Sequence, residues 1–96
     1  MHMTWAASAR KHGISEESSR YVIEHCGLYL KIPAPPHSPA GLNASRRLYL
    51  GDDENGTPLE VIAIPVETDE LLVIHAMELR DQFRTRYMKV KKWQTS

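Results

Sequence analysis

Side chains that could act on a phosphodiester occur in three places along this chain of 96 residues. His12 follows Lys11 near the N-terminus, and His75 lies at the end of an apolar stretch. The third place is a basic segment near the C-terminus that holds Arg80, Arg84, Arg86, Tyr87 and Lys89. Cleavage of RNA without a metal requires a base for the 2′-hydroxyl, cations for the phosphorane charge and an acid for the leaving oxygen. These residue types can supply the base, the cations and the acid, so the sequence suggests RNA cleavage as a hypothesis.

Each of these places also has a structural explanation that involves no catalysis. The apolar neighbours of His75 are typical of a hydrogen-bonded core histidine. Lys11 and His12 would form a basic helix end, which the helix dipole favours. Tyr87 fits a core residue whose hydroxyl reaches water, and a basic helix face is more often solvated surface than a binding site. The combination of the three places therefore favours catalysis more than any one of them does.

Metal, cofactor and disulfide chemistry are not indicated. The sequence contains no glycine-rich phosphate loop, no nucleophile elbow and no Cys/His cluster with zinc spacing, so we expect neither a metal nor a cofactor. Cys26 is the single cysteine and fits a buried, inert thiol. The chain has no stretch of about 20 apolar residues and no signal-peptide pattern. We therefore expect a cytoplasmic protein that makes no contact with a membrane.

The net charge of zero is the sum over three segments, of which the first and last are basic and the middle one is acidic. Residues 1–50 contain six basic and three acidic side chains, which gives +3. Residues 51–79 contain eight acidic and no basic side chains, and residues 80–96 contain six basic side chains and one acidic, for −8 and +5. Such asymmetry predicts surfaces suited to different partners, although the acidic and basic segments could also pair with each other. A net charge of zero therefore does not exclude an RNA-binding protein.

The first half of the chain predicts two helices, a strand and a loop. Thr4 can cap a short helix over Trp5–Lys11, and Ser15 can cap a second helix that ends at Gly27. Alternating apolar residues predict a strand over Leu28–Ile32, and four prolines predict a loop over 33–44. The opening Met1-His2 is typical of a cloning scar and is left out of the predicted fold.

The second half predicts three strands and a helix. Strands are expected over Arg46–Leu50, Leu59–Val66 and Leu71–Ala76, with a hairpin turn at Asn55-Gly56. Because Pro65 lacks an N–H, the middle one should be an edge strand or carry a bulge. From Leu79 onward, apolar residues recur at helical spacing with basic residues between them. The sequence thus predicts a single α+β domain over 1–96: a small antiparallel sheet of about four strands, two N-terminal helices and a C-terminal basic amphipathic helix.

The motif around His12 resembles a known family. Trp5 followed by Lys11-His12-Gly13-Ile14-Ser15 is similar to the N-terminal motif of BrnT-type toxins. These belong to the RelE-like ribonuclease toxins, which are small α+β proteins neutralised by an antitoxin, and the hairpin strands and Arg-rich last helix are similar in layout. The resemblance implies functional roles for Lys11, His12, Arg80, Arg84 and Tyr87.

Two positions depart from the family pattern. The spacer between Trp5 and Lys11 is shorter than is usual in the family, and Met77 stands where an arginine is expected. Either His75 or Arg80 replaces the missing positive group, or the site is altered and inactive.

Together these patterns predict the toxin of a type II toxin–antitoxin system, acting as a metal-independent endoribonuclease. His12, His75, Arg80 and Tyr87 are the expected catalytic residues. The residues expected to hold RNA are Lys11, Arg84, Arg86 and Lys89. The expected partners are RNA and a protein antitoxin, with an oligomer as an option in the antitoxin complex.

Two further hypotheses do without catalysis. The chain could be an RNA- or protein-binding module of the same fold that uses the basic helix. It could also be a partner-binding subunit whose acidic strands and Pro65 edge add to a sheet of another chain.

Overall fold

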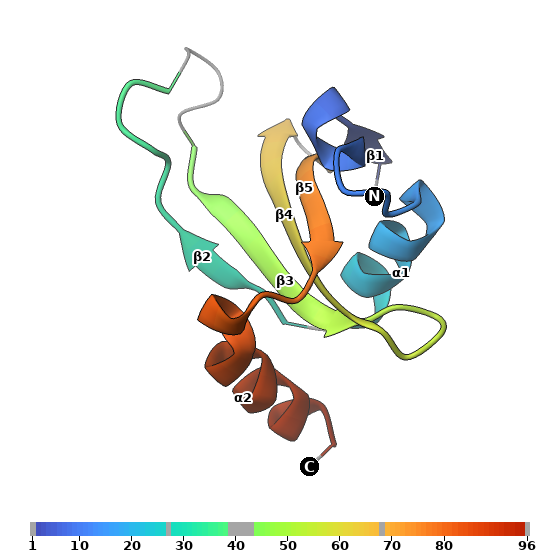
Figure 1. Ribbon diagram of the computed structural model, residues 1–96. Helices are drawn as coiled ribbons and strands as arrows, with labels where there is room; N and C mark the ends of the chain where they lie inside the picture. Colours follow the sequence, from blue (N-terminus) through green and yellow to red (C-terminus); the bar gives the residue numbers. More distant parts are fainter. Residues whose placement is uncertain (1, 27, 39–43, 68, 96) are drawn as a thin grey trace.

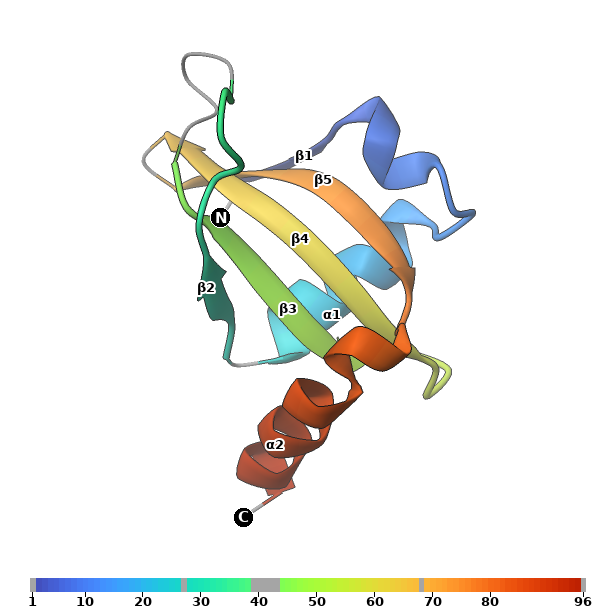
Figure 2. The same cartoon turned by 60° about the vertical axis from the view of Figure 1, so that its left-hand side comes forward.

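A five-stranded sheet with one helix against each face forms the protein. The computed structural model describes residues 2–26, 28–38, 44–67 and 69–95. Along the chain the elements are β1 (His2–Trp5), the 3₁₀ turn η1 (Ala7–Arg10), α1 (Glu16–Cys26), β2 (Leu30–Ile32), β3 (Arg46–Asp52), β4 (Pro58–Glu67), β5 (Glu70–Glu78), η2 (Asp81–Phe83) and α2 (Arg84–Thr95). The strand order is β1-β5-β4-β3-β2, with α1 behind the sheet and α2 at its lower end (Figures 1 and 2). The α+β class is therefore confirmed.

The N-terminal segment differs from the prediction. Residues 2–5 form β1, which pairs in parallel with β5 and places Met3 opposite Leu71, and only η1 remains of the first predicted helix. The sheet therefore has five strands and is not purely antiparallel, and His2 belongs to it. Met3 is buried against a strand that lies nearly 70 residues away in the sequence. A local pattern cannot reveal such pairing, because tertiary contacts override helix propensity.

The predictions for the remaining elements are largely correct. Ser15 caps α1, since its Oγ accepts a hydrogen bond from the Ser18 N–H. The 52–56 turn is present, with Gly56 at φ +82°. The edge position predicted for Leu59–Val66 is wrong, because β4 lies between β3 and β5. The alternative of a bulge is correct, since the register shifts between Pro65 and Glu67. Residues 39–43 of the predicted proline-rich loop lie outside the described residues.

Each face of the sheet has its own apolar core. The core under α1 is the larger, with Val22, Ile23 and Cys26 packed against buried strand residues that include Tyr49, Val61 and Val73. On the other face, Leu48, Leu50 and Tyr87 form a smaller core. The buried thiol of Cys26 is 2% exposed, as predicted. None of the described helices is long and apolar enough to span a membrane.

A bulge in β5 decides which face His75 occupies. Ile62 pairs with His75, whereas the next residue, Ala63, pairs with Val73, so the register skips Ile74. Because side chains alternate along a strand, the extra residue returns Ala76 to the α1 core and aims His75 at the opposite face. The Ser8 hydroxyl donates a hydrogen bond of 2.6 Å to the carbonyl oxygen of the bulged Ile74.

Candidate functional site

One buried carboxylate joins two of the predicted catalytic residues. Glu60 lies near the start of β4, and its side chain is wholly buried. Its Oε2 is 2.8 Å from Nε2 of His75 and 2.7 Å from Nη2 of Arg80. Arg80 also donates to this carboxylate from Nε and from its backbone N–H, the latter to Oε1 at 2.8 Å. Glu60 thus fixes the end of β5 and the start of η2 around a single carboxylate.

The hydrogen bonds around Glu60 determine its protonation state. Burial by itself would raise the pKa of this carboxyl, but the hydrogen bonds from Arg80 and His75 outweigh burial and hold the pKa below its usual value. The hydrogen bond to Glu60 in turn raises the pKa of Arg80. Since an ionised carboxylate can only accept, Nε2 of His75 must be the donor. In neutral His75 the lone pair then lies on Nδ1, which is the atom available to take a proton.

A second imidazole lies beside this cluster. The ring centroids of His12 and His75 are 5.7 Å apart, with the planes at 68°. His12 follows η1, which packs along β5, so β1 and η1 bring the N-terminal motif to the end of the sheet. The side chains of His75 and Arg80 are 20% and 44% exposed, so both reach solvent. The cluster of Glu60, His75, Arg80 and His12, here called the Glu60 cluster, therefore offers a proton acceptor, a cation and a second imidazole to a ligand.

The lowered pKa of Glu60 gives a testable pH dependence of stability. The unfolded chain binds this proton near pH 4.5, whereas the folded chain binds it only at lower pH. The stabilisation is therefore complete above about pH 4.5 and is lost as the pH falls through the folded pKa. We expect the urea midpoint of the native protein to fall between pH 5 and pH 3 more steeply than that of Glu60→Gln. Parallel curves for the two proteins would contradict this assignment.

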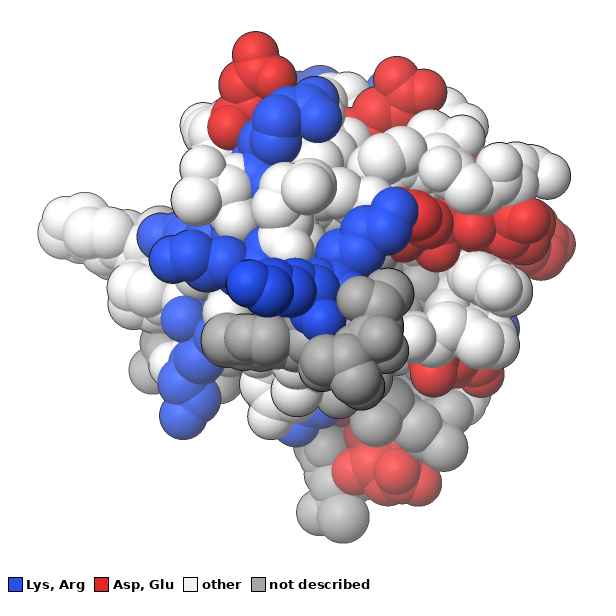
Figure 3. Space-filling view, turned by 90° about the horizontal axis from the view of Figure 1, so that it is seen from below, with Lys and Arg blue, Asp and Glu red and all other residues white. Residues whose placement is uncertain are grey.

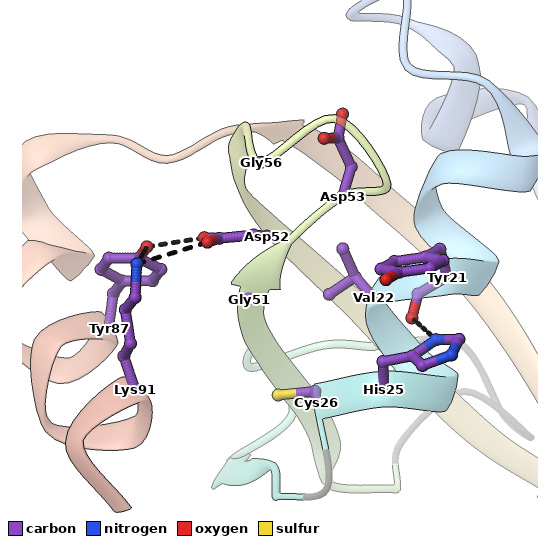
Figure 4. Close-up of a pocket in the computed structure, with 10 residues that line it drawn as sticks. All are labelled: Tyr21, Val22, His25, Cys26, Gly51, Asp52, Asp53, Gly56, Tyr87 and Lys91. Atoms are coloured by element: carbon purple, nitrogen blue, oxygen red, sulfur yellow. Dashed lines mark hydrogen bonds and ion pairs between the residues drawn. The ribbon is translucent and has the colours of Figure 1, made fainter. Parts of the chain in front are cut away.

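Tyr87, the fourth predicted catalytic residue, lies outside the Glu60 cluster. Its hydroxyl donates a hydrogen bond of 2.6 Å to Asp52 at the end of β3, and Nζ of Lys91 is 3.3 Å away (Figure 4). Burial, followed by the bond to Asp52, raises the pKa of Tyr87. Because Tyr87 is only 5% exposed, we assign it a packing role and leave it out of the mechanism below.

Tyr87 and Asp52 form one wall of a cavity of about 330 Å³ that lies between α1 and α2. The opposite wall contains the stacked rings of Tyr21 and His25, whose centroids are 4.0 Å apart (Figure 4). The cavity is lined by carboxylates, phenols and an ammonium group, which do not together favour one class of ligand, so we assign it none.

The four predicted RNA-binding residues lie on the surface. Lys11 precedes His12, and the others project from α2, whose only buried residues in the described range are Tyr87 and Val90. Seen from the α2 end, lysine and arginine side chains lie next to one another across the surface (Figure 3). Arg84 pairs with Asp81 and Lys91 pairs with Asp52, each at 3.4 Å, so at least two cations of the basic helix have acidic partners.

Two features of the site could not be predicted from the sequence. The first is Glu60, which belongs to no recognised motif. Burial of an unpaired carboxylate costs free energy, so a glutamate inside the apolar run Leu59–Ile64 was the only hint in the sequence that this side chain has a partner. The second is the arrangement of Arg80, whose guanidinium lies on the same Glu60 carboxylate as His75.

No protein-family model matches the chain, and a search of curated proteins finds no significant match. Any proposal about function therefore depends on the geometry of the Glu60 cluster and on the motif around His12.

Proposed function

We propose that the protein is a metal-independent endoribonuclease and the toxin of a type II toxin–antitoxin system. The observation that carries the proposal is the buried Glu60 carboxylate, which holds the imidazole of His75 and the guanidinium of Arg80 on one oxygen, with both side chains partly exposed to solvent. A carboxylate that accepts from one ring nitrogen fixes the tautomer, so the other nitrogen becomes the base, and it stabilises the imidazolium that forms. The motif at Lys11–Ser15 supports the family assignment.

The arrangement supports cleavage by internal transesterification. Nδ1 of His75 takes the proton of the 2′-hydroxyl, and the 2′ oxygen attacks the adjacent phosphorus. Arg80 stabilises the charge that develops on the phosphorane oxygens. As the bond from phosphorus to the 5′ oxygen breaks, protonated His12 donates a proton to that oxygen. The products are a 2′,3′-cyclic phosphate and a 5′-hydroxyl, and no step requires a metal.

The exposed cations around the site fit the rest of the RNA strand. Lys11 lies beside His12 in the chain, and Arg84, Arg86 and Lys89 extend along α2. Because the phosphate backbone dominates the affinity of nucleic-acid binding, these side chains should make that binding depend on salt.

The biological context of the proposal has its own test. A toxin of this class acts in the cytoplasm and is neutralised by an antitoxin, in a complex that can be oligomeric. Expression of the chain alone should arrest growth, and co-expression of the product of an adjacent gene should restore it. Arrest that persists with every adjacent gene product would contradict the toxin–antitoxin assignment.

The enzymatic proposal predicts RNA cleavage in the presence of EDTA. We expect Arg80→Ala to lower the rate by about 10²–10³-fold, because one group that stabilises the transition-state charge is lost. Arg80→Lys should recover only part of the rate, since an ammonium cannot form the same fork of hydrogen bonds to Glu60. Arg10→Ala is the control, because the exposed Arg10 side chain pairs with Glu16 and not with Glu60. Equal rates for the native protein and Arg80→Ala would remove Arg80 from the mechanism.

A second candidate function is an RNA-binding module without catalysis. The exposed basic residues of α2 favour it, because they do not depend on the Glu60 cluster. This function predicts salt-sensitive binding of RNA with no cleavage products under any of the above conditions.

A further inference from the structure

Two cations lie directly opposite each other where β2 pairs with β3. The antiparallel register places Lys31 opposite Arg47. Both side chains point to the α1 face of the sheet, since Arg47 also pairs with Ala63 of the α1 core. Like charges at such positions are destabilising, so this pair costs stability unless an anion joins it.

The arginine of this pair is held in place by an aromatic ring. The Arg47 guanidinium lies over the ring of Tyr29, 4.5 Å from its centroid. Tyr29 in turn contacts Tyr49, with ring centroids 5.6 Å apart. Among the residues that the structure describes, no carboxylate forms an ion pair with Lys31 or Arg47. Arg47 is therefore held in place by Tyr29, and within the described part of the chain no carboxylate neutralises the charge of Lys31 or Arg47.

A hollow of about 390 Å³ lies beside the pair. It is lined by Lys31 and Arg47 together with Tyr29, Ser45 and Pro65. A guanidinium fork and an ammonium group next to a hydroxyl are the donors that suit the oxygens of a phosphate.

A second groove shares the lining residue Lys31 with this hollow. Lys31 also lines a groove of about 420 Å³ between β2 and α2, together with Arg86 and Lys89. Cations therefore follow one another from α2 around the edge strand β2 to Arg47. This continuity favours a long, flexible polyanion over a compact acidic segment of a protein.

We propose that Lys31 and Arg47 bind a phosphate of a single-stranded RNA on the face of the sheet opposite to the Glu60 cluster. The strand would pass from the cluster along α2 and around β2 to this position. The inference rests on the proposed function for its ligand, but it concerns a separate surface.

The test is binding of a 2′-O-methyl RNA of 20 nucleotides, which cannot be cleaved by the proposed route, as a function of salt. Each lost phosphate contact lowers the slope of log K against log salt by about 0.7 for a single strand. Lys31→Gln/Arg47→Gln removes this one phosphate contact and should therefore lower the slope by about 0.7 and weaken binding, while Arg10→Gln should leave the slope unchanged.

Three results would overturn the inference. They are an unchanged slope in the double variant, an equal change in Arg10→Gln, and a loss of affinity for polyglutamate but not for RNA, which would identify an acidic polypeptide as the ligand. Failure of the two proposals can be told apart. Normal RNA cleavage with an unchanged slope removes this surface only, whereas the expected slope without any cleavage removes the enzyme only.

Discussion

Glu60→Gln should lower RNA cleavage by at least about 100-fold and the free energy of unfolding by about 2 kcal/mol. The neutral amide cannot accept from His75 and Arg80 in the way the carboxylate does, so their orientation and the stabilisation of the imidazolium are lost. The stability loss follows because hydrogen bonds to a charged group contribute about 1.5–3 kcal/mol, and Glu60 is wholly buried.

The measurements are the initial rate of RNA cleavage and the urea midpoint of the same preparation. Glu78→Gln is a matched control, since Glu78 is exposed at the end of β5 and should leave both quantities unchanged. If Glu60→Gln keeps the native cleavage rate while its midpoint falls, the carboxylate is only structural and does not orient a base.

His75→Gln should remove catalysis and leave most of the stability in place. A glutamine amide can still donate a hydrogen bond toward Glu60, but it has no nitrogen that takes a proton. Loss of a general base lowers rates by about 10²–10⁴-fold. Because the side chain is partly exposed, the fold should tolerate the change with a small shift in the urea midpoint.

This variant separates catalysis from folding, which Glu60→Gln cannot do alone. His25→Gln is the control, since His25 is an exposed histidine of α1 whose Nδ1 and ring both contact Tyr21 of the same helix. A His75→Gln protein that folds and cleaves RNA at the native rate would exclude His75 as the base.

Local patterns account for most of the helices and strands but not for the sheet's edges. The alternation that predicts β3 and β5, the turn before Gly56 and the cap at Ser15 are properties of neighbouring residues, and each is found in the structure. β1 depends on pairing with β5, a contact between the two ends of the chain. Pro65 indicates the edge of a sheet by its missing N–H, but a register shift next to it in a central strand satisfies the same constraint.

The candidate site was predictable in its residue types but not in its geometry. His12, His75 and Arg80 follow from the chemistry that imidazole and guanidinium groups can perform, and the structure brings all three together. The carboxylate that His75 and Arg80 share is on another strand, β4, and the bulge at Ile74 that aims His75 toward it has no local sequence signal. Tyr87 lies on the last helix as predicted, but its hydroxyl donates a hydrogen bond to Asp52 and does not reach the Glu60 cluster.

The most direct test of the central claim compares an RNA oligonucleotide with its 2′-O-methyl counterpart in EDTA, with the fragment ends identified by mass spectrometry. If the Glu60 cluster cleaves RNA through the 2′-hydroxyl, the RNA yields 2′,3′-cyclic phosphate ends and the methylated strand remains intact. Cleavage of both strands, or of neither by a preparation that binds RNA, would contradict the account.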